Sequence, residues 1–393
     1  MTRQPEIDAL RGLMLVLMCV SHLPTRFAEW LGQPFGFVSA AEGFVFLSAY
    51  LVGVVYSGRA RRFGQAEMRK ALWRRAAVVY RSHVAMLAFL FTIIAWIGIR
   101  SERQAITNLI SFYLQEPWTA LWTSAALIYT PPLLDILPMY VLFMAASPLV
   151  LPLAMRPGGK AVVIALSASL WIAAQFGLND VAYAAVAKSI HHRVPLDQNG
   201  AFDLWAWQFV WTLGLCLGAR RALATGRSPW VSARFAARIA AVALFVALGC
   251  MLWRHAVGQA PFPGVPQLDV LFDKWHLGPL RMLNFFALAV VLMHFGPRLA
   301  PLARAPGLQL LGRQSLPAFC AHLVVVLIAL SVIGDNADQL SIWTELGLVG
   351  GTLFIVGFVA WVASENGRKG RSPQGIALGV QMQAVGGEKL SAR

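Results

Sequence analysis

The chain has 393 residues, of which 58% are hydrophobic and only 13% are charged. Soluble globular domains contain about 25% charged residues, so this composition excludes an ordinary soluble domain and indicates a polytopic membrane protein. The net charge of +15 would favour nucleic-acid binding only if the basic residues gathered on one surface, which depends on how the chain crosses the membrane.

Ten stretches are apolar enough to cross a bilayer, which takes about 20 residues in a helix. They cover residues 9–24, 38–56, 76–99, 133–154, 161–178, 203–219, 236–254, 279–296, 315–333 and 343–363. The stretch 104–130 is amphipathic and contains Pro117, so we expect an interfacial helix on the membrane surface. The predicted fold class is an all-α, polytopic transmembrane helix bundle, with one membrane domain over residues 1–364 and a flexible cytoplasmic tail over 365–393.

The distribution of basic residues supports this layout. With the N-terminus in the cytoplasm, the inner segments hold about three times as many Lys and Arg residues as the outer loops. Because these residues are shared among several loops and tails, we expect no nucleic-acid partner. The pattern predicts two cytoplasmic termini and a multi-pass membrane protein. All four cysteines lie inside apolar runs, so we expect neither disulfides nor a metal site.

The first span, "EIDALRGLMLVLMCVSHLP", carries three ionisable side chains in a setting where unpaired charge is costly. Asp8 and Arg11 are three residues apart and can pair on a helix. Arg11 and His22 are eleven residues apart, so they share one helix face and lie about 16 Å apart along it. Arg11 alone could be a cytoplasmic anchor and His22 alone an interfacial cap before Pro24. Together on one face they indicate a polar path.

The second and third spans carry further charge. Glu42, in "SAAEGFVFLSAYLVG", lies about one turn inside the outer boundary, at the depth expected for His22. It could orient the imidazole and raise its basicity, or it could snorkel to the interface. In "WRRAAVVYRSHVAML", Arg75 lies near the inner end, and Arg81 and His83 lie deeper. A guanidinium at that depth needs an anion from the protein or from a ligand phosphate.

Ionisable residues also occur in later spans. Asp135 lies near the outer end of the fourth span, Lys274 and Arg281 lie at the outer end of the eighth, and His322 lies near the middle of the ninth. A lone intramembrane histidine is more often a satisfied core residue than a catalyst. Several spans that carry ionisable residues in one bundle, however, indicate a shared polar cavity.

Seven segments of the chain resemble a known group of proteins. They are "DALRG", "SHLP", "FGFVSAAEGFVFLSAYLVGVVY", "VYRSH", "LLDILPMY", "KWHLGPLRMLNFFAL" and "GRQSLPAFCAH", which run from residue 8 to residue 322. The chain resembles the transmembrane acyltransferases, which include the acyltransferase type 3 family, and in particular the OpgC family, associated with succinylation of osmoregulated periplasmic glucans. Ala49 departs from the pattern, because such proteins usually have Gly after the Ser of "FLSG".

The resemblance implies a ten-helix acyltransferase with a cytoplasmic acyl-CoA donor and an acceptor outside. It implies that His22 matches the catalytic histidine of the first helix and that Arg11 matches the arginine at the donor end. The family leaves the acyl group open, so succinyl-CoA and acetyl-CoA are both candidate co-substrates. The expected partners are a glycan acceptor and membrane lipid, and the expected location is the bacterial inner (plasma) membrane.

The candidate residues fit acyl transfer in three roles. We expect a catalytic group in which His22 is the general base, Glu42 orients it and Arg281 stabilises the oxyanion. We expect a donor-binding group in which guanidiniums hold CoA phosphates, formed by Arg11, Arg75 and Arg81. We expect a supporting group made of Asp8, which would hold Arg11, together with His83, Asp135, Lys274 and His322; Lys274 is a second candidate for the oxyanion.

Other interpretations of these residues stay open. Transfer could be direct, or it could pass through a covalent acyl-histidine. Intramembrane Asp, Glu, Arg and His also mark proton relays, so a proton-coupled secondary transporter or exporter is the alternative function. The sequence lacks the internal repeat that would mark an inverted-repeat transporter, which weighs against it. A purely structural or sensory protein would not need so many buried ionisable groups.

Overall fold

The computed structural model describes residues 4–101, 103–190, 194, 199–223, 232–259, 261–262, 264–296, 304–334 and 340–369. Within these ranges the chain forms helices and turns and no strand, which confirms the predicted all-α class. The helices are α1 (Pro5–His22), α2 (Phe27–Gly32), α3 (Ala40–Phe89), η1 (Leu90–Ile94), α4 (Ala95–Ser101), α5 (Gln104–Leu109), α6 (Ser111–Gln115), α7 (Pro117–Ala125), α8 (Ile136–Ala154), α9 (Gly159–Ala174), α10 (Leu178–Ile190), α11 (Leu204–Leu223), α12 (Ala233–Val257), η3 (Pro266–Phe272), α13 (Pro279–Phe295), α14 (Pro306–Arg313), α15 (Ser315–Ile333) and α16 (Ile342–Lys369).

Several of these helices are built to cross a membrane. Five stretches of the described chain are long and apolar enough: Ala40–Ser101, Ile136–Ala154, Ala233–Val257, Ser315–Ile333 and Ile342–Arg368. The count rises to six if α9 and α10, which meet at 84°, form one broken span. The chain is therefore a membrane protein, while the ten-span layout and the cytoplasmic termini stay predictions. Helix α16 extends into the predicted tail, and residues 370–393 lie outside the described ranges.

The second and third predicted spans are joined by helix rather than by a loop. Helix α3 continues through η1 and α4 to Ser101, and it is interrupted at Gly64, whose φ of 84° and ψ of 167° suit a residue without a Cβ. Phe44 and Val79, which lie on either side of this break, line the same small cavity. The chain therefore folds back at Gly64, and its two halves lie against each other.

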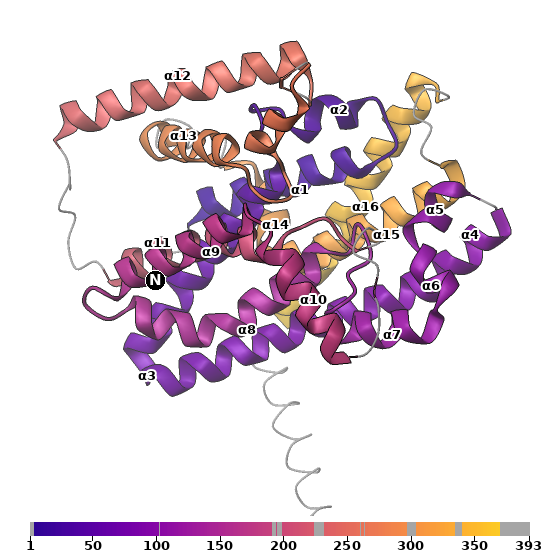
Figure 1. Ribbon diagram of the computed structural model, residues 1–393, viewed down its shortest axis with the longest axis horizontal. Coiled ribbons are helices and arrows are strands. Elements are labelled where there is room, and N and C mark those ends of the chain that lie inside the picture. Colours follow the sequence, from indigo (N-terminus) through magenta and orange to yellow (C-terminus); the bar gives the residue numbers. More distant parts are fainter. Residues whose placement is uncertain are drawn as a thin grey trace, which may run out of the picture.

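Glycines set the spacing between α3 and α11. A Cβ added to Gly218 would lie 2.0 Å from the carbonyl oxygen of Tyr50, so the two backbones are in direct contact. Ala49 is fully buried and faces Gly214, which has no side chain of its own to compete for the space. This explains how Ala49 is accommodated at a position where the resembling proteins have Gly. Figure 1 shows α3 and α8 side by side at one edge of the bundle and α12 along the opposite edge.

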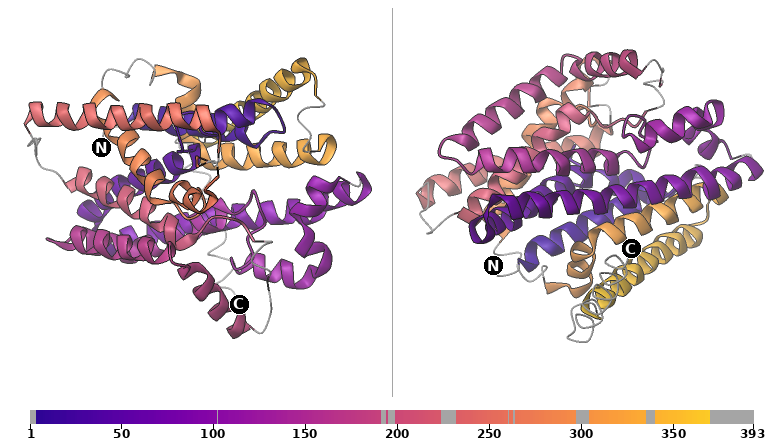
Figure 2. Two further views of the ribbon diagram at one scale, coloured as in Figure 1. Left: turned by 45° about the horizontal axis from the view of Figure 1, so that its top comes forward. Right: turned by 90° about the horizontal axis from the view of Figure 1, so that it is seen from below.

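Helix α1 is fixed against the short helix α14, which the sequence pattern did not predict as a separate element. A Cβ on Gly12 would lie 2.0 Å from the carbonyl oxygen of Leu308, and a Cβ on Gly312 would lie 1.8 Å from that of Asp8. Each helix thus offers a glycine to the backbone of the other. Helix α1 also contacts α3, α15 and α16, which places it inside the bundle (Figure 2).

The segment predicted as one interfacial helix consists of three short helices, α5, α6 and α7. Their buried residues, among them Ile106, Phe112 and Ala120, pack against the bundle, while Trp118 is 83% exposed. The carbonyl oxygens at the end of α7 accept hydrogen bonds from α3, through Tyr80 and His83. The segment is therefore amphipathic as predicted, but it is folded onto the bundle in pieces.

Candidate functional site

Two histidines meet at the centre of the candidate site. His22 is the last residue of α1, and His322 is a fully buried residue of α15. Their nitrogens, His22 Nδ1 and His322 Nε2, are 3.1 Å apart, and the two rings are stacked with centroids 5.3 Å apart and an interplanar angle of 20°. The sequence placed both residues in the bundle, and the structure shows that they are direct partners.

The partners of these rings define their protonation. The Nδ1 of His322 lies 2.9 Å from the carbonyl oxygen of Phe319, which can only accept, so this Nδ1 carries a proton. In a neutral His322 the Nε2 atom is then an acceptor, and His22 Nδ1 must donate to it. A neutral His22 therefore keeps its basic lone pair on Nε2. Within the described ranges this atom has no hydrogen-bond partner.

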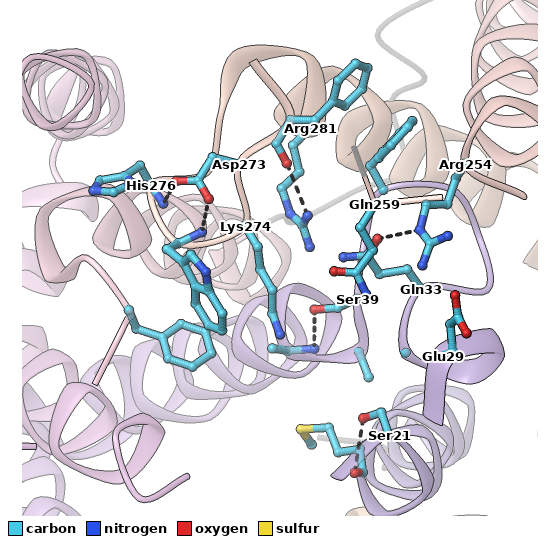
Figure 3. Close-up of a pocket in the computed structure, with 18 of the residues that line it drawn as sticks. Ser21, Glu29, Gln33, Ser39, Arg254, Gln259, Asp273, Lys274, His276 and Arg281 are labelled. Atoms are coloured by element: carbon cyan, nitrogen blue, oxygen red, sulfur yellow. Dashed lines mark hydrogen bonds and ion pairs between the residues drawn. The ribbon is translucent and has the colours of Figure 1, made fainter. Parts of the chain in front are cut away.

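His22 lines a polar cavity of about 590 Å³, which we call the His22 cavity. Its wall includes residues of helices α1, α2, α12 and α13, the first residues of α3 and α8, Phe202 and the segment 269–276. The charged residues of this wall are Glu29, Arg254, Asp269, Asp273, Lys274 and Arg281. In Figure 3, Arg281 and Lys274 enter from the same side, with their charged ends directed toward Ser39. The cavity is large and polar enough to admit a hydrophilic substrate.

Glu42 does not contact His22, contrary to the prediction. Its carboxylate completes the capping box at the start of α3, where it accepts hydrogen bonds from the backbone N–H and hydroxyl of Ser39. Its other oxygen accepts a hydrogen bond from Arg281 Nε at 2.5 Å, and both residues are almost completely buried. The carboxylate is thus occupied in holding Arg281, and the partner that orients His22 is His322.

Arg281 is only partly satisfied by this pairing. Its Nη1 donates weakly to the carbonyl oxygen of Phe272 at 3.4 Å, while Nη2 is buried and has no partner among the described residues. Asn284, one turn further along α13, accepts a hydrogen bond from the backbone N–H of Phe37 at 2.9 Å. The α13 end therefore provides a fixed cation with one buried donor whose hydrogen bond is unmet among the described residues.

The segment between η3 and α13 brings Lys274 into the same cavity. Its Nζ lies 4.5 Å from the centroid of the Trp275 ring, and burial lowers the pKa of its ammonium group. Asp273 and His276 form an ion pair at the rim, and their hydrogen bond raises the pKa of His276. The backbone of this segment is anchored by Trp207, whose indole donates to the carbonyl oxygen of Trp275 at 3.0 Å.

Arg11 lies at the other end of α1, where its guanidinium is bound to α14 and α15. Its guanidinium donates to the carbonyl oxygen of Gly312 at 3.0 Å and to the hydroxyl of Ser315 at 2.5 Å. Asp8, which was expected to hold Arg11, forms an ion pair with Arg313 at 3.7 Å, and its support of Arg11 stays a prediction. The Nε of Arg11 is buried without a partner among the described residues.

Arg11 and Arg75 line the same small cavity of about 20 Å³, which we call the Arg11 cavity. The remaining lining residues are Phe44, Val79, Ile136, Leu137, Tyr140, Ser315, Leu316 and Phe319. This volume is close to that of one water molecule, so any larger ligand requires side chains to move. The structure thus brings two of the three predicted donor-binding arginines together.

Three predicted residues lie away from both cavities. Arg81 is exposed, so the expected buried anion is not needed, and its donor-binding role stays a prediction. His83 is fully buried, and its Nε2 lies 3.2 Å from the carbonyl oxygen of Ser124, which makes it a core histidine. Asp135 is buried just before α8, close to Gly200, and lines neither cavity.

Several residues of the His22 cavity were not predicted from the sequence. They include Gln33, Arg254 and Asp273; Arg254 donates through Nε to Gln33 at 2.9 Å. Asp273 directly precedes the predicted Lys274, so its sequence neighbourhood could have identified it. Arg254 looked like an ordinary basic residue at a span end, and no sequence signal separated it from the others.

The described residues contain no group of three or more His, Cys, Asp or Glu side chains placed to hold a metal ion. A family model described as "OpgC protein" matches residues 3–368 of the chain. No curated protein and no solved structure matches it.

Proposed function

The chain belongs to the OpgC family, whose role is of the acyltransferase type in glucan modification, and from this premise we propose that it is a membrane O-acyltransferase. It would move a succinyl or acetyl group from cytoplasmic acyl-CoA to a hydroxyl of a periplasmic or envelope glycan. The observation that carries this proposal is the His22–His322 pair, which leaves a basic nitrogen free in a polar cavity. The proposal includes ten spans, cytoplasmic termini and an inner-membrane location.

His22 acts as the general base in this proposal. Its Nε2 takes the proton of the acceptor hydroxyl while the hydroxyl oxygen attacks the thioester carbonyl. The resulting imidazolium keeps its Nδ1–H on His322 Nε2, which stabilises the new charge. When the tetrahedral intermediate collapses, the C–S bond breaks and the proton on Nε2 passes to the CoA sulfur. Atoms and charge then balance, with an ester and free CoA as products.

The cations of the His22 cavity suit the developing oxyanion. Arg281 has a buried donor, Nη2, without a partner among the described residues, and Glu42 holds its guanidinium in place. A fixed donor of this kind needs no reorganisation as charge develops on the carbonyl oxygen. Lys274 enters the cavity beside it and offers a second cation (Figure 3). The role of Glu42 is thus to position Arg281.

The donor would bind from the other end of α1. Arg11 and Arg75 share a cavity, and guanidiniums recognise phosphates through paired hydrogen bonds. Arg11 and His22 lie about 16 Å apart along one helix, so an extended pantetheine arm could join phosphates at Arg11 to a thioester near His22. The small volume of the Arg11 cavity means that this cavity opens when the donor binds.

An acyl-transfer assay on the purified chain tests the proposal, with succinyl-CoA and acetyl-CoA as donors and a β-glucan oligosaccharide as acceptor. His22→Ala should abolish turnover but leave donor affinity unchanged, whereas Arg11→Ala should weaken donor affinity. His83→Gln is the matched control, because it removes a buried imidazole outside both cavities. Normal turnover by His22→Ala would refute the catalytic assignment. Glycan flux into vesicles without CoA release would favour the transporter instead.

A further inference from the structure

The two cavities of this protein meet at a single side chain. Of the described residues that line either the His22 cavity or the Arg11 cavity, Ile136 is the one that lines both. It is the first residue of α8 and is only 5% exposed. A path from the arginine end of α1 to the histidine end through these cavities therefore passes Ile136.

Two aromatic rings form part of the wall of the Arg11 cavity. The Phe44 and Phe319 rings are stacked with centroids 6.1 Å apart, and both line the Arg11 cavity next to Ile136. The Phe319 ring also meets the His322 ring edge-on at 5.1 Å, so the wall continues directly to the histidine pair. The guanidinium of Arg11 lies 5.6 Å from the centroid of Phe44. The junction is thus apolar, although charged or basic groups lie on both sides of it.

Ile136 is suited to setting the width of this junction. A β-branched side chain has one strongly preferred χ1 rotamer in a helix, so it yields less readily than Leu or Met would. Protein interiors are closely packed, so changing a buried side chain by a single methylene group alters the space available beside it. The cavity on the arginine side holds only about 20 Å³, so there is little free space beside Ile136 on that side.

We propose that Ile136 is a specificity-determining residue, a constriction that limits the size of the acyl group passing from the Arg11 cavity to the His22 cavity. This inference rests on the proposed function, because it assumes a thioester that moves along α1. A short acyl group passes the constriction, whereas a longer or bulkier aliphatic chain clashes with the Ile136 side chain. Neither the histidine pair nor the arginines would set this limit.

The experiment compares acetyl-CoA, succinyl-CoA and hexanoyl-CoA as donors for the full-length purified protein. Ile136→Ala should raise the hexanoyl-to-acetyl ratio of kcat/KM by about ten-fold or more, as expected when an apolar pocket gains room for extra methylenes. Ile136→Val should give a smaller increase, and it keeps the test available if the alanine variant fails to fold. Ile136→Phe should reduce transfer of the succinyl group while leaving affinity for CoA itself unchanged.

Ile106→Ala is the matched control, because Ile106 is a buried isoleucine that lines neither the His22 cavity nor the Arg11 cavity. Its donor ratio should stay close to that of the wild type. Affinity for hexanoyl-CoA relative to CoA, from thermal stabilisation, gives a second readout that needs no turnover. If the wild-type protein binds donors but transfers nothing, the proposed function fails, and the affinity ratio still decides the role of Ile136. Unchanged ratios in Ile136→Ala and Ile136→Val would overturn the inference.

Discussion

His322 offers the sharpest test of how the histidine pair works. Replacing it with Phe keeps an aromatic ring in the stack with His22 but removes the nitrogen that accepts the His22 Nδ1–H. A neutral His22 would then be free to carry its proton on Nε2, which is the wrong tautomer for a base facing the His22 cavity. The imidazolium formed during transfer would also lose its partner.

The expected loss follows from the hydrogen bond that is removed. A buried hydrogen bond to a charged group contributes about 1.5–3 kcal/mol, and it is made in full only once His22 has taken the proton. Since each 1.36 kcal/mol is a factor of ten in rate, His322→Phe should lower kcat by about 10- to 150-fold. The KM for the donor should change little, because Arg11 and Arg75 lie in the other cavity.

His322→Gln separates this role from a purely structural one. The glutamine amide can donate to the carbonyl oxygen of Phe319 and accept from His22 Nδ1, as the imidazole does. His322→Gln should therefore recover most of the lost rate in steady-state acyl-transfer assays. It should do so even though glutamine resembles the ring shape of histidine less closely than phenylalanine does. Wild-type kcat in His322→Phe, or equal loss in both variants, would refute the reasoning.

Two further predictions concern ion pairs. Glu42→Gln leaves Arg281 buried without its counter-charge, so the folded state should lose about 3–5 kcal/mol, measured as a lower midpoint of thermal inactivation. The control Glu67→Gln breaks an exposed pair with Arg59 and should have little effect. The raised pKa of His276 predicts that its pair with Asp273 stabilises the fold below the ordinary pKa of 6.5 and that this contribution disappears as the pH rises through the raised pKa. Thermal midpoints of the wild type should show this fall with pH, and Asp273→Asn should remove it; an identical pH dependence in both proteins would contradict the assignment.

The part of the site that lies on one helix could be predicted from the sequence. The helical period relates Arg11 to His22, and α1 runs without interruption through both residues, with Leu15 and Met18 between them on the same face. Positions of this kind depend only on local geometry. The all-α class followed in the same way from the apolar stretches.

The pairings between helices could not be predicted in this way. His22 and His322 are 300 residues apart in the chain, and Arg281 and Glu42 are 239 apart. Depth in a membrane places such residues at one level, but the contacts depend on how the helices are rotated and arranged. Arg81 was expected inside the bundle but is exposed. The sequence of one span does not reveal which of its faces the neighbouring helices cover.

The glycine contact between α1 and α14 has a consequence for how this protein can vary. It fixes one end of α1, while the pairing with His322 fixes the other. An insertion of one residue between Gly12 and His22 would turn the imidazole by about 100° around the helix axis and lengthen the segment by about 1.5 Å. The apolar residues of this segment can therefore be exchanged for others of similar size, but their number cannot change without uncoupling the two ends.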